Sequence, residues 1–98
     1  MGSFTVRMSF AAADRARIAE HLRVLSEATR REPGCVSYIG HFVIPAAGEV
    51  ETVVIYEQYV DEAAVEHHKS TAHFAEHATG GLYGLMLSRE LEHLDAVC

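Results

Sequence analysis

Alternation of apolar and polar side chains marks the first element of the chain. Residues 3–10 place Phe4, Val6, Met8 and Phe10 on one face and polar side chains on the other. Strict alternation of this kind predicts a β-strand with one buried face.

Two later stretches are rich in β-branched and aromatic residues, as strands are. They cover residues 35–44 and 52–60, and the connection from Pro45 to Glu51 has hairpin length. Both faces of these strands are apolar, apart from Ser37, His41, Glu57 and Gln58. We expect Val36, Tyr38, Phe42 and Ile44 to face one way and Ile39 and Val43 the other, and Val53 and Ile55 to oppose Val54 and Tyr56.

Helical spacing of apolar residues follows the first strand. Asp14 is a candidate N-cap for a helix over residues 15–31, which Pro33-Gly34 would end. Asp61 is a candidate N-cap for a second helix. A further short helix after Ser70-Thr71 ends near Gly80-Gly81 or extends to Met86, and the glycine pair fits a turn or a helix interruption rather than a phosphate loop.

Residues 88–97 are compatible with a strand or with a frayed helix. The order β-α-β-β-α-β, the split βαβ arrangement, requires a fourth strand and therefore favours the strand. We expect an α+β fold of the ferredoxin-like type, in which helices cover one face of an antiparallel sheet. The other face should then be polar. Because the middle strands are apolar on both faces, we expect a second copy of the sheet to cover it in a homodimer.

Length and composition restrict the class of protein. The 98 residues fit one domain over 1–98, with 49% hydrophobic and 22% charged residues. Only eight Lys and Arg accompany a net charge of -6, so neither a nucleic-acid partner nor a membrane partner is expected. No signal peptide or membrane span is visible, which favours the cytoplasm. Cys35 and Cys98 are expected to be thiols, with Cys35 a small core residue.

Two segments carry a resemblance to a known family. GCVSY at 34–38 and VVIYEQYVDEAAVEHHKSTAHF at 53–74 resemble the antibiotic biosynthesis monooxygenase family of dimeric α/β barrels, over about residues 5–95. The shared positions are Pro33, Gly34, Cys35, Tyr38, Tyr56, Glu57, Tyr59, Asp61, Ala63, Ala64, His68, His73 and Phe74. One departure is Tyr59, where the family commonly has Trp, and it affects the wall of the pocket.

The resemblance implies oxygenation of a small phenolic or quinol-type molecule by O₂, without metal, flavin or haem. It implies a homodimer with an apolar pocket in each subunit for a small apolar or aromatic molecule. There are two alternatives, because members of one fold differ widely in function. One is a non-catalytic small-molecule-binding domain of the same fold, and the other is a haem-binding or haem-degrading protein that uses His77.

Four of the seven histidines lie between positions 67 and 77. Imidazole titrates near neutral pH and suits removal of a phenolic proton. His68 matches the helix histidine of the family and is the first candidate base, with His73 the second. His67 should face solvent, because adjacent helical residues point about 100° apart.

Other polar side chains are candidates for substrate binding. Tyr38, Tyr56 and Tyr59 would orient a substrate hydroxyl, and His41 would line the pocket from the middle of its strand. Glu57 is a charged residue in an otherwise apolar strand, so it needs an oppositely charged partner. We expect a structural ion pair with Arg7 or Arg89.

Metal binding and haem binding are two further hypotheses that the histidine positions raise. His73 and His77 share the i, i+4 spacing of helical metal ligands, but there is no HExxH motif and no cysteine pair, so no metal is expected. His77 occupies the position of the iron ligand in haem-degrading relatives of this fold. Those relatives also use an Asn on the first strand and a Trp on the third, and this chain has neither.

Overall fold

A computed structural model describes residues 2–46 and 48–97; Cys98 lies outside them. The chain forms one antiparallel sheet in the order β2-β3-β1-β4. Its strands are β1 (Gly2–Ala11), β2 (Cys35–Phe42), β3 (Val50–Tyr59) and β4 (Ser88–Leu94). The expected fourth strand therefore exists, although it ends at Leu94 and is exposed along its whole length. This order is that of the ferredoxin-like α+β fold.

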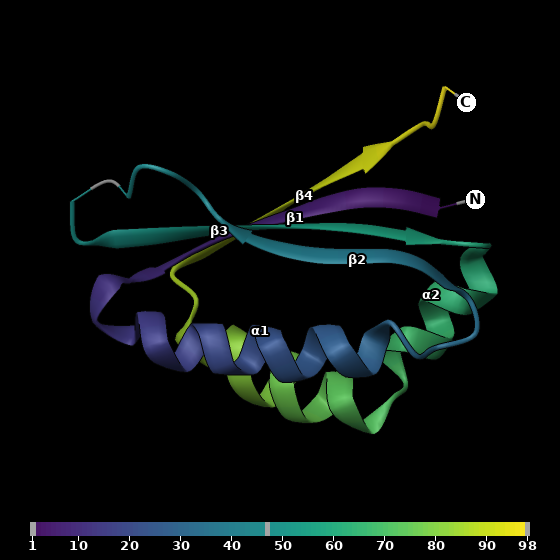
Figure 1. The fold of residues 1–98 in the computed structure, drawn as a ribbon, viewed down its shortest axis with the longest axis horizontal. Coiled ribbons are helices and arrows are strands. Elements are labelled where there is room, and N and C mark those ends of the chain that lie inside the picture. Colours follow the sequence, from purple (N-terminus) through teal and green to yellow (C-terminus); the bar gives the residue numbers. More distant parts are fainter. Residues whose placement is uncertain (1, 47, 98) are drawn as a thin grey trace.

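All helical elements pack on one side of the sheet, and the N- and C-terminal ends of the chain lie near the same end of the molecule (Figure 1). They are η1 (Ala12–Asp14, a 3₁₀ turn), α1 (Arg15–Thr29), α2 (Glu62–Lys69), the π-helix η2 (Phe74–Leu82) and α3 (Tyr83–Leu85). The helix after Ser70 therefore continues through Gly80-Gly81, as the longer of the two expectations had it. Among the described residues, no helix is long and apolar enough to cross a bilayer.

Local signals account for how the helices begin and end. The Asp61 side chain accepts a hydrogen bond from Ala64 N at 2.8 Å and caps α2, as expected. Asp14 stands at the N-cap position of α1, but its side chain makes no capping bond and contacts Arg17 instead. Helix α1 ends at Thr29, shortly before Pro33-Gly34.

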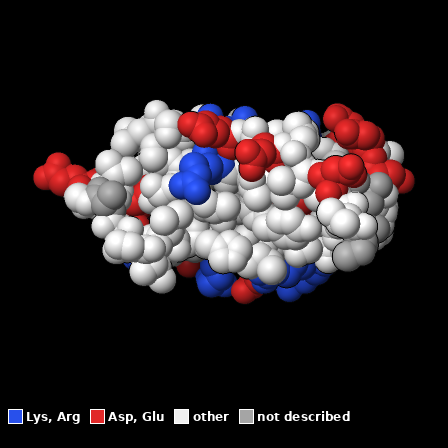
Figure 2. Space-filling view, turned by 90° about the horizontal axis from the view of Figure 1, so that it is seen from above, with Lys and Arg blue, Asp and Glu red and all other residues white. Residues whose placement is uncertain are grey.

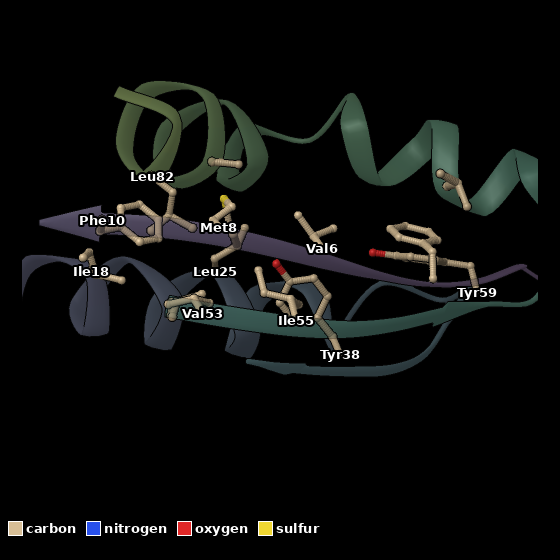
Figure 3. Packing of buried hydrophobic residues seen from close by; sticks show 14 residues of the cluster. Val6, Met8, Phe10, Ile18, Leu25, Tyr38, Val53, Ile55, Tyr59 and Leu82 are labelled. Atoms are coloured by element: carbon tan, nitrogen blue, oxygen red, sulfur yellow. The ribbon is translucent and has the colours of Figure 1, made fainter. Parts of the chain in front are cut away.

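The core fills the layer between the helices and the inner sheet face. Side chains from both layers point into it (Figure 3). Phe10, Val53 and Tyr59 from the sheet and Ile18 from α1 are fully buried. Cys35 packs against this core as expected, and burial raises the pKa of its thiol, which disfavours the nucleophilic thiolate.

A β-bulge at the start of β2 changes the expected facing of its side chains. Cys35 pairs with Tyr59 and Ser37 with Gln58, so Val36 is the extra residue. Val36 is consequently exposed, although we expected it beside the buried Tyr38. Ile44 lies beyond the end of β2 and is also exposed.

The sheet face opposite the helices is open. It carries Ile39 and His41 of β2, and Val54 and Tyr56 of β3 beside them. Ile39 is 44% exposed. Seen from this side, a broad uncharged surface runs across the molecule, and most charged side chains gather toward its margins (Figure 2). The apolar outer face expected for β2 and β3 is therefore present.

Gly34 lets α2 approach the turn after α1. A Cβ at Gly34 would collide with Ala64 Cβ, on a helix that cannot easily give way. We expect Gly34→Ala to lower the free energy of unfolding by about 1–3 kcal/mol in urea denaturation. Gly84→Ala, whose added Cβ meets nothing within 4 Å, is the control and should be neutral or slightly stabilising. An unchanged midpoint for Gly34→Ala would contradict this close approach.

A candidate active site beneath helix α2

A cavity of about 280 Å³ lies between the sheet and the helices. β1 and β3 form its floor, β4 one side, and α2, η2 and α3 its roof. Most of its lining area is apolar, and the polar side chains that line it are Ser3, Tyr38, Glu57, Glu62, His68, Lys69, Tyr83, Arg89 and His93. An apolar pocket with a few convergent polar groups is the usual form of a small-molecule site.

Helix α2 carries His68 to the cavity. Val65 and His68 are three positions apart, so they share the face of α2 that packs on the sheet. His68 is 4% exposed, whereas His67 faces solvent as expected. The His68 ring lies 5.4 Å from the Tyr59 ring and meets the edge of Phe74 at 5.1 Å, between centroids. Aromatic rings from β3 and η2 therefore pack against it.

Glu32 holds His68 from behind. His68 Nδ1 donates to Glu32 Oε2 at 2.9 Å, and His73 Nε2 donates to the same oxygen at 2.6 Å. The Glu32 side chain is 4% exposed and that of His73 is 22% exposed. The carboxylate therefore joins a buried imidazole to one that reaches the surface. His73 does not line the cavity.

Burial lowers the pKa of His68, although its hydrogen bond to Glu32 and the charge of that carboxylate act in the opposite direction. The imidazole is consequently neutral at neutral pH. Because Nδ1 donates to Glu32, Nε2 carries the lone pair and is the atom that can accept a proton.

Glu57 lies on the cavity floor and faces His68. Its Oε1 accepts a hydrogen bond from the Tyr59 hydroxyl at 2.7 Å and lies 3.9 Å from His68 Nε2. Burial raises the pKa of Glu57 to about 7, against the opposing effects of the Tyr59 hydrogen bond and the charge of Arg89. The site therefore contains a second group that exchanges protons near neutral pH.

The expected ion pair of Glu57 is not formed. Arg7 pairs with Val54 on the open face, whereas Glu57 is on the inner face, so the sheet separates the two side chains. Arg89 is on the inner face and lines the cavity, with its guanidinium 5.3 Å from the Tyr83 ring centroid. Among the described residues, neither arginine reaches Glu57 within ion-pair distance.

The four predicted substrate-binding residues separate into two groups. Tyr38 lines the cavity, and burial raises the pKa of its hydroxyl well above the ordinary value. Tyr59 is buried behind His68, and its hydroxyl is committed to Glu57. Tyr56 and His41 lie on the open face, and the ring of His41 contacts Val54 O at 3.1 Å. Those two residues therefore do not meet the cavity.

His77 also lies outside the cavity lining. Its Nδ1 is 3.0 Å from Nδ1 of His21 on α1, and the two rings are 5.3 Å apart. His73 and His77 thus face different partners, so the i, i+4 spacing does not bring them to one ion. The position suggested for a haem ligand packs against α1.

Glu32 is the site residue that the sequence did not reveal. It follows Arg30-Arg31 and precedes Pro33, which makes it look like a solvated residue before a turn. Its burial comes from α2 and η2, which arrive from far along the chain. The sequence also did not reveal Tyr83 on the cavity wall, because the glycines at 80, 81 and 84 around it left the facing of its side chain ambiguous.

The geometry defines an α+β domain of the ferredoxin-like type, with acid–base groups lining a largely apolar cavity. The family model described as antibiotic biosynthesis monooxygenase matches residues 1–80. The chain therefore belongs to this family. No match was found among the curated proteins compared.

Solved structures share the fold over almost the whole chain. A crystal structure of an antibiotic biosynthesis monooxygenase is 23% identical, with a TM-score of 0.87 and full coverage of both chains. PA3566 from Pseudomonas aeruginosa is 24% identical, with a TM-score of 0.85 over 99% of this chain and 94% of the other. Rv0793 from Mycobacterium tuberculosis is 19% identical, with a TM-score of 0.84 over 99% and 95%. At these identities the likeness shows the fold.

The pKa of Glu57 predicts a pH-dependent stability effect. The pKa of Glu57 is about 7 in the folded protein, whereas the ordinary value of a glutamate carboxyl is 4.5. The folded protein therefore holds this proton to higher pH than the unfolded chain, and stability is lost as the pH rises through this window. Glu57→Gln removes this titration. Between pH 4.5 and 7.5 the free energy of unfolding of the variant should therefore rise by up to about 3 kcal/mol relative to that of wild type. Urea denaturation at both pH values measures it.

Glu66→Gln is the matched control for this measurement, because Glu66 is exposed on α2. Its difference from wild type should be the same at both pH values. A pH-independent difference for Glu57→Gln as well would mean that the buried carboxyl titrates normally.

Proposed function

We propose that the chain is a cofactor-independent monooxygenase that oxidises a small phenolic or quinol-type substrate with O₂. The observation that carries this proposal is the His68 imidazole, backed by the buried carboxylate of Glu32, at the wall of an apolar cavity. A carboxylate that orients an imidazole and stabilises its protonated form is a recurring arrangement in catalysis.

His68 acts as the base in this proposal. It is neutral at neutral pH because burial lowers its pKa, and Nε2 faces the cavity side, near Glu57. When Nε2 accepts the phenolic proton, the resulting imidazolium is stabilised by Glu32. The apolar surroundings exclude water from the reactive species that follow.

The proposed reaction balances with O₂ alone. The phenolate transfers one electron to O₂, and the phenoxyl radical and superoxide combine to a peroxide at a ring carbon that bears hydrogen. That carbon's proton passes to the departing oxygen as the O–O bond breaks, which leaves a quinone and hydroxide. The released hydroxide takes the proton from His68 and becomes water, so one oxygen atom ends in the quinone and one in water.

The cavity favours a compact aromatic substrate. Its volume of about 280 Å³ is at the lower end for small-molecule sites, which suits one or two fused rings. The apolar lining contacts the ring system. Among the described residues Tyr38 has no hydrogen-bond partner for its hydroxyl, so this group is the proposed anchor for a second substrate oxygen.

Oxygen uptake tests the proposal. Purified protein is incubated with a panel of reduced quinols and phenols in an oxygen electrode. We expect uptake with at least one compound, and His68→Gln should lower the rate by roughly 10²–10⁴-fold, the usual contribution of a general base. His67→Gln, one position away and exposed, is the matched control and should keep the wild-type rate.

Two results would contradict the proposal. Tight binding of a phenol without any uptake would favour the non-catalytic binding domain instead. An unaffected rate in His68→Gln would exclude His68 as the base.

We also propose that two chains associate through the open sheet faces. Ile39, Val54 and Tyr56 lie side by side on neighbouring strands there, and Ile39 remains 44% exposed in a single chain. Association would remove this apolar surface from water. It would not cover the cavity, which is on the helix side.

Ile39→Asp tests this association. A charge at the centre of an apolar interface should convert the protein from a dimer to a monomer of 10.8 kDa in light scattering at micromolar concentration. Leu87→Asp is the control, since Leu87 is 65% exposed and precedes β4, and it should stay dimeric. A wild-type protein that is already monomeric would refute the association.

A further inference from the structure

A second kind of site lies behind the His68 ring, on the side away from the cavity. His68 Nδ1, His73 Nε2 and a carboxylate oxygen of Glu32 all lie within 4.8 Å of one another. We propose that these three residues bind a divalent transition-metal ion of the Zn²⁺ type. Neither the family membership nor the proposed oxygenation requires such a site.

The ligand set suits this class of ion. Two imidazoles and one carboxylate bind Zn²⁺ and Fe²⁺ in many proteins, whereas Mg²⁺ and Ca²⁺ prefer oxygen ligands alone. Ligand atoms at about 2.0–2.2 Å from a tetrahedral ion are roughly 3.3–3.6 Å apart. The two N···O separations here are 2.6 and 2.9 Å, so the ion could enter with small side-chain shifts.

The other carboxylate oxygen supports the same conclusion. Glu32 Oε1 is buried and, among the described residues, has no hydrogen-bond partner. Leaving a buried acceptor of a charged group unpaired is costly. A cation bound by both oxygens of Glu32 would satisfy it. No Lys or Arg in the described part of the chain forms an ion pair with Glu32, so its two histidines are its only partners there.

The surroundings give an ion a route to the three ligands and place a further carboxylate near His68. The His73 side chain is 22% exposed, so an ion can enter from its side and keep a water or a further ligand. His68 Nε2 lies 3.9 Å from Glu57 Oε1. Histidine ligands of metals usually donate their other ring N–H to a carboxylate, and Glu57 is in position to accept it.

An ion on Nδ1 would also change what His68 can do. Nε2 would then carry the proton, so the imidazole could no longer accept one from the cavity. If the proposed function holds, the metal-loaded protein is therefore inhibited. The binding of the ion does not depend on that function.

Metal titration tests the site without any substrate. Untagged protein is titrated with Zn²⁺ by calorimetry and with Co²⁺ by visible absorption at pH 7.5. We expect one ion per chain, with affinity lowered at least roughly tenfold in His73→Gln and in Glu32→Gln. His67→Gln, the exposed neighbour on α2, should bind as wild type does. Circular dichroism checks that each variant is folded.

Three results would overturn the proposal. They are the absence of binding in wild type, equal affinity in folded His73→Gln and Glu32→Gln, and a thiolate charge-transfer band with Co²⁺, which would place the ion on a cysteine. Because these readouts need neither O₂ nor a phenol, a failure to detect oxygen uptake would leave them unaffected.

Discussion

The buried carboxylate of Glu32 is the constraint on which the site depends. It lies at the turn between α1 and β2, and it accepts hydrogen bonds from His68 on α2 and from His73 at the start of η2. These bonds join two parts of the chain that are 36 and 41 positions apart. Among the described residues these two histidines are the partners of the Glu32 carboxylate, and it fixes their geometry strongly because an unpaired buried carboxylate would be unfavourable.

This constraint shapes both the cavity and the chemistry of its wall. Held from behind by Glu32, the His68 ring directs Nε2 toward Glu57 and packs its faces and edges against aromatic rings. Burial lowers the pKa of His68 and raises that of Glu57 to about 7. Two acid–base groups whose pKa values are shifted by burial thus lie in one apolar space, which is typical of functional sites. Together with the two histidines, the same carboxylate forms a set of potential metal ligands. The proposed catalytic base and the proposed metal site therefore share one cluster of residues.

The fold restricts where a ligand can lie. The helices cover the inner face of β1, β2 and β3, while β4 stays exposed along its length and forms the side of the cavity. The open face of the sheet is separate from this region and carries Ile39 and Tyr56. The proposed binding of a small molecule and the proposed association of two chains therefore involve opposite faces of the same sheet.

Local patterns of apolar, β-branched and aromatic residues in the sequence determined the first three strands and the helices, and the order β-α-β-β-α-β then required the fourth strand. Period-two alternation identified β1, and the Asp61 cap with helical spacing placed His68 inside and His67 outside. The alternation failed at the bulge in β2, which exposes Val36. The expected pairing of Arg7 with Glu57 failed because the two side chains lie on opposite faces of the sheet. Only the tertiary structure decided that Tyr38 meets the cavity and Tyr56 does not, and that Glu32 is buried. Nothing near Glu32 distinguishes it from a solvated turn residue, because its burial comes from helices that join it only when the whole chain packs.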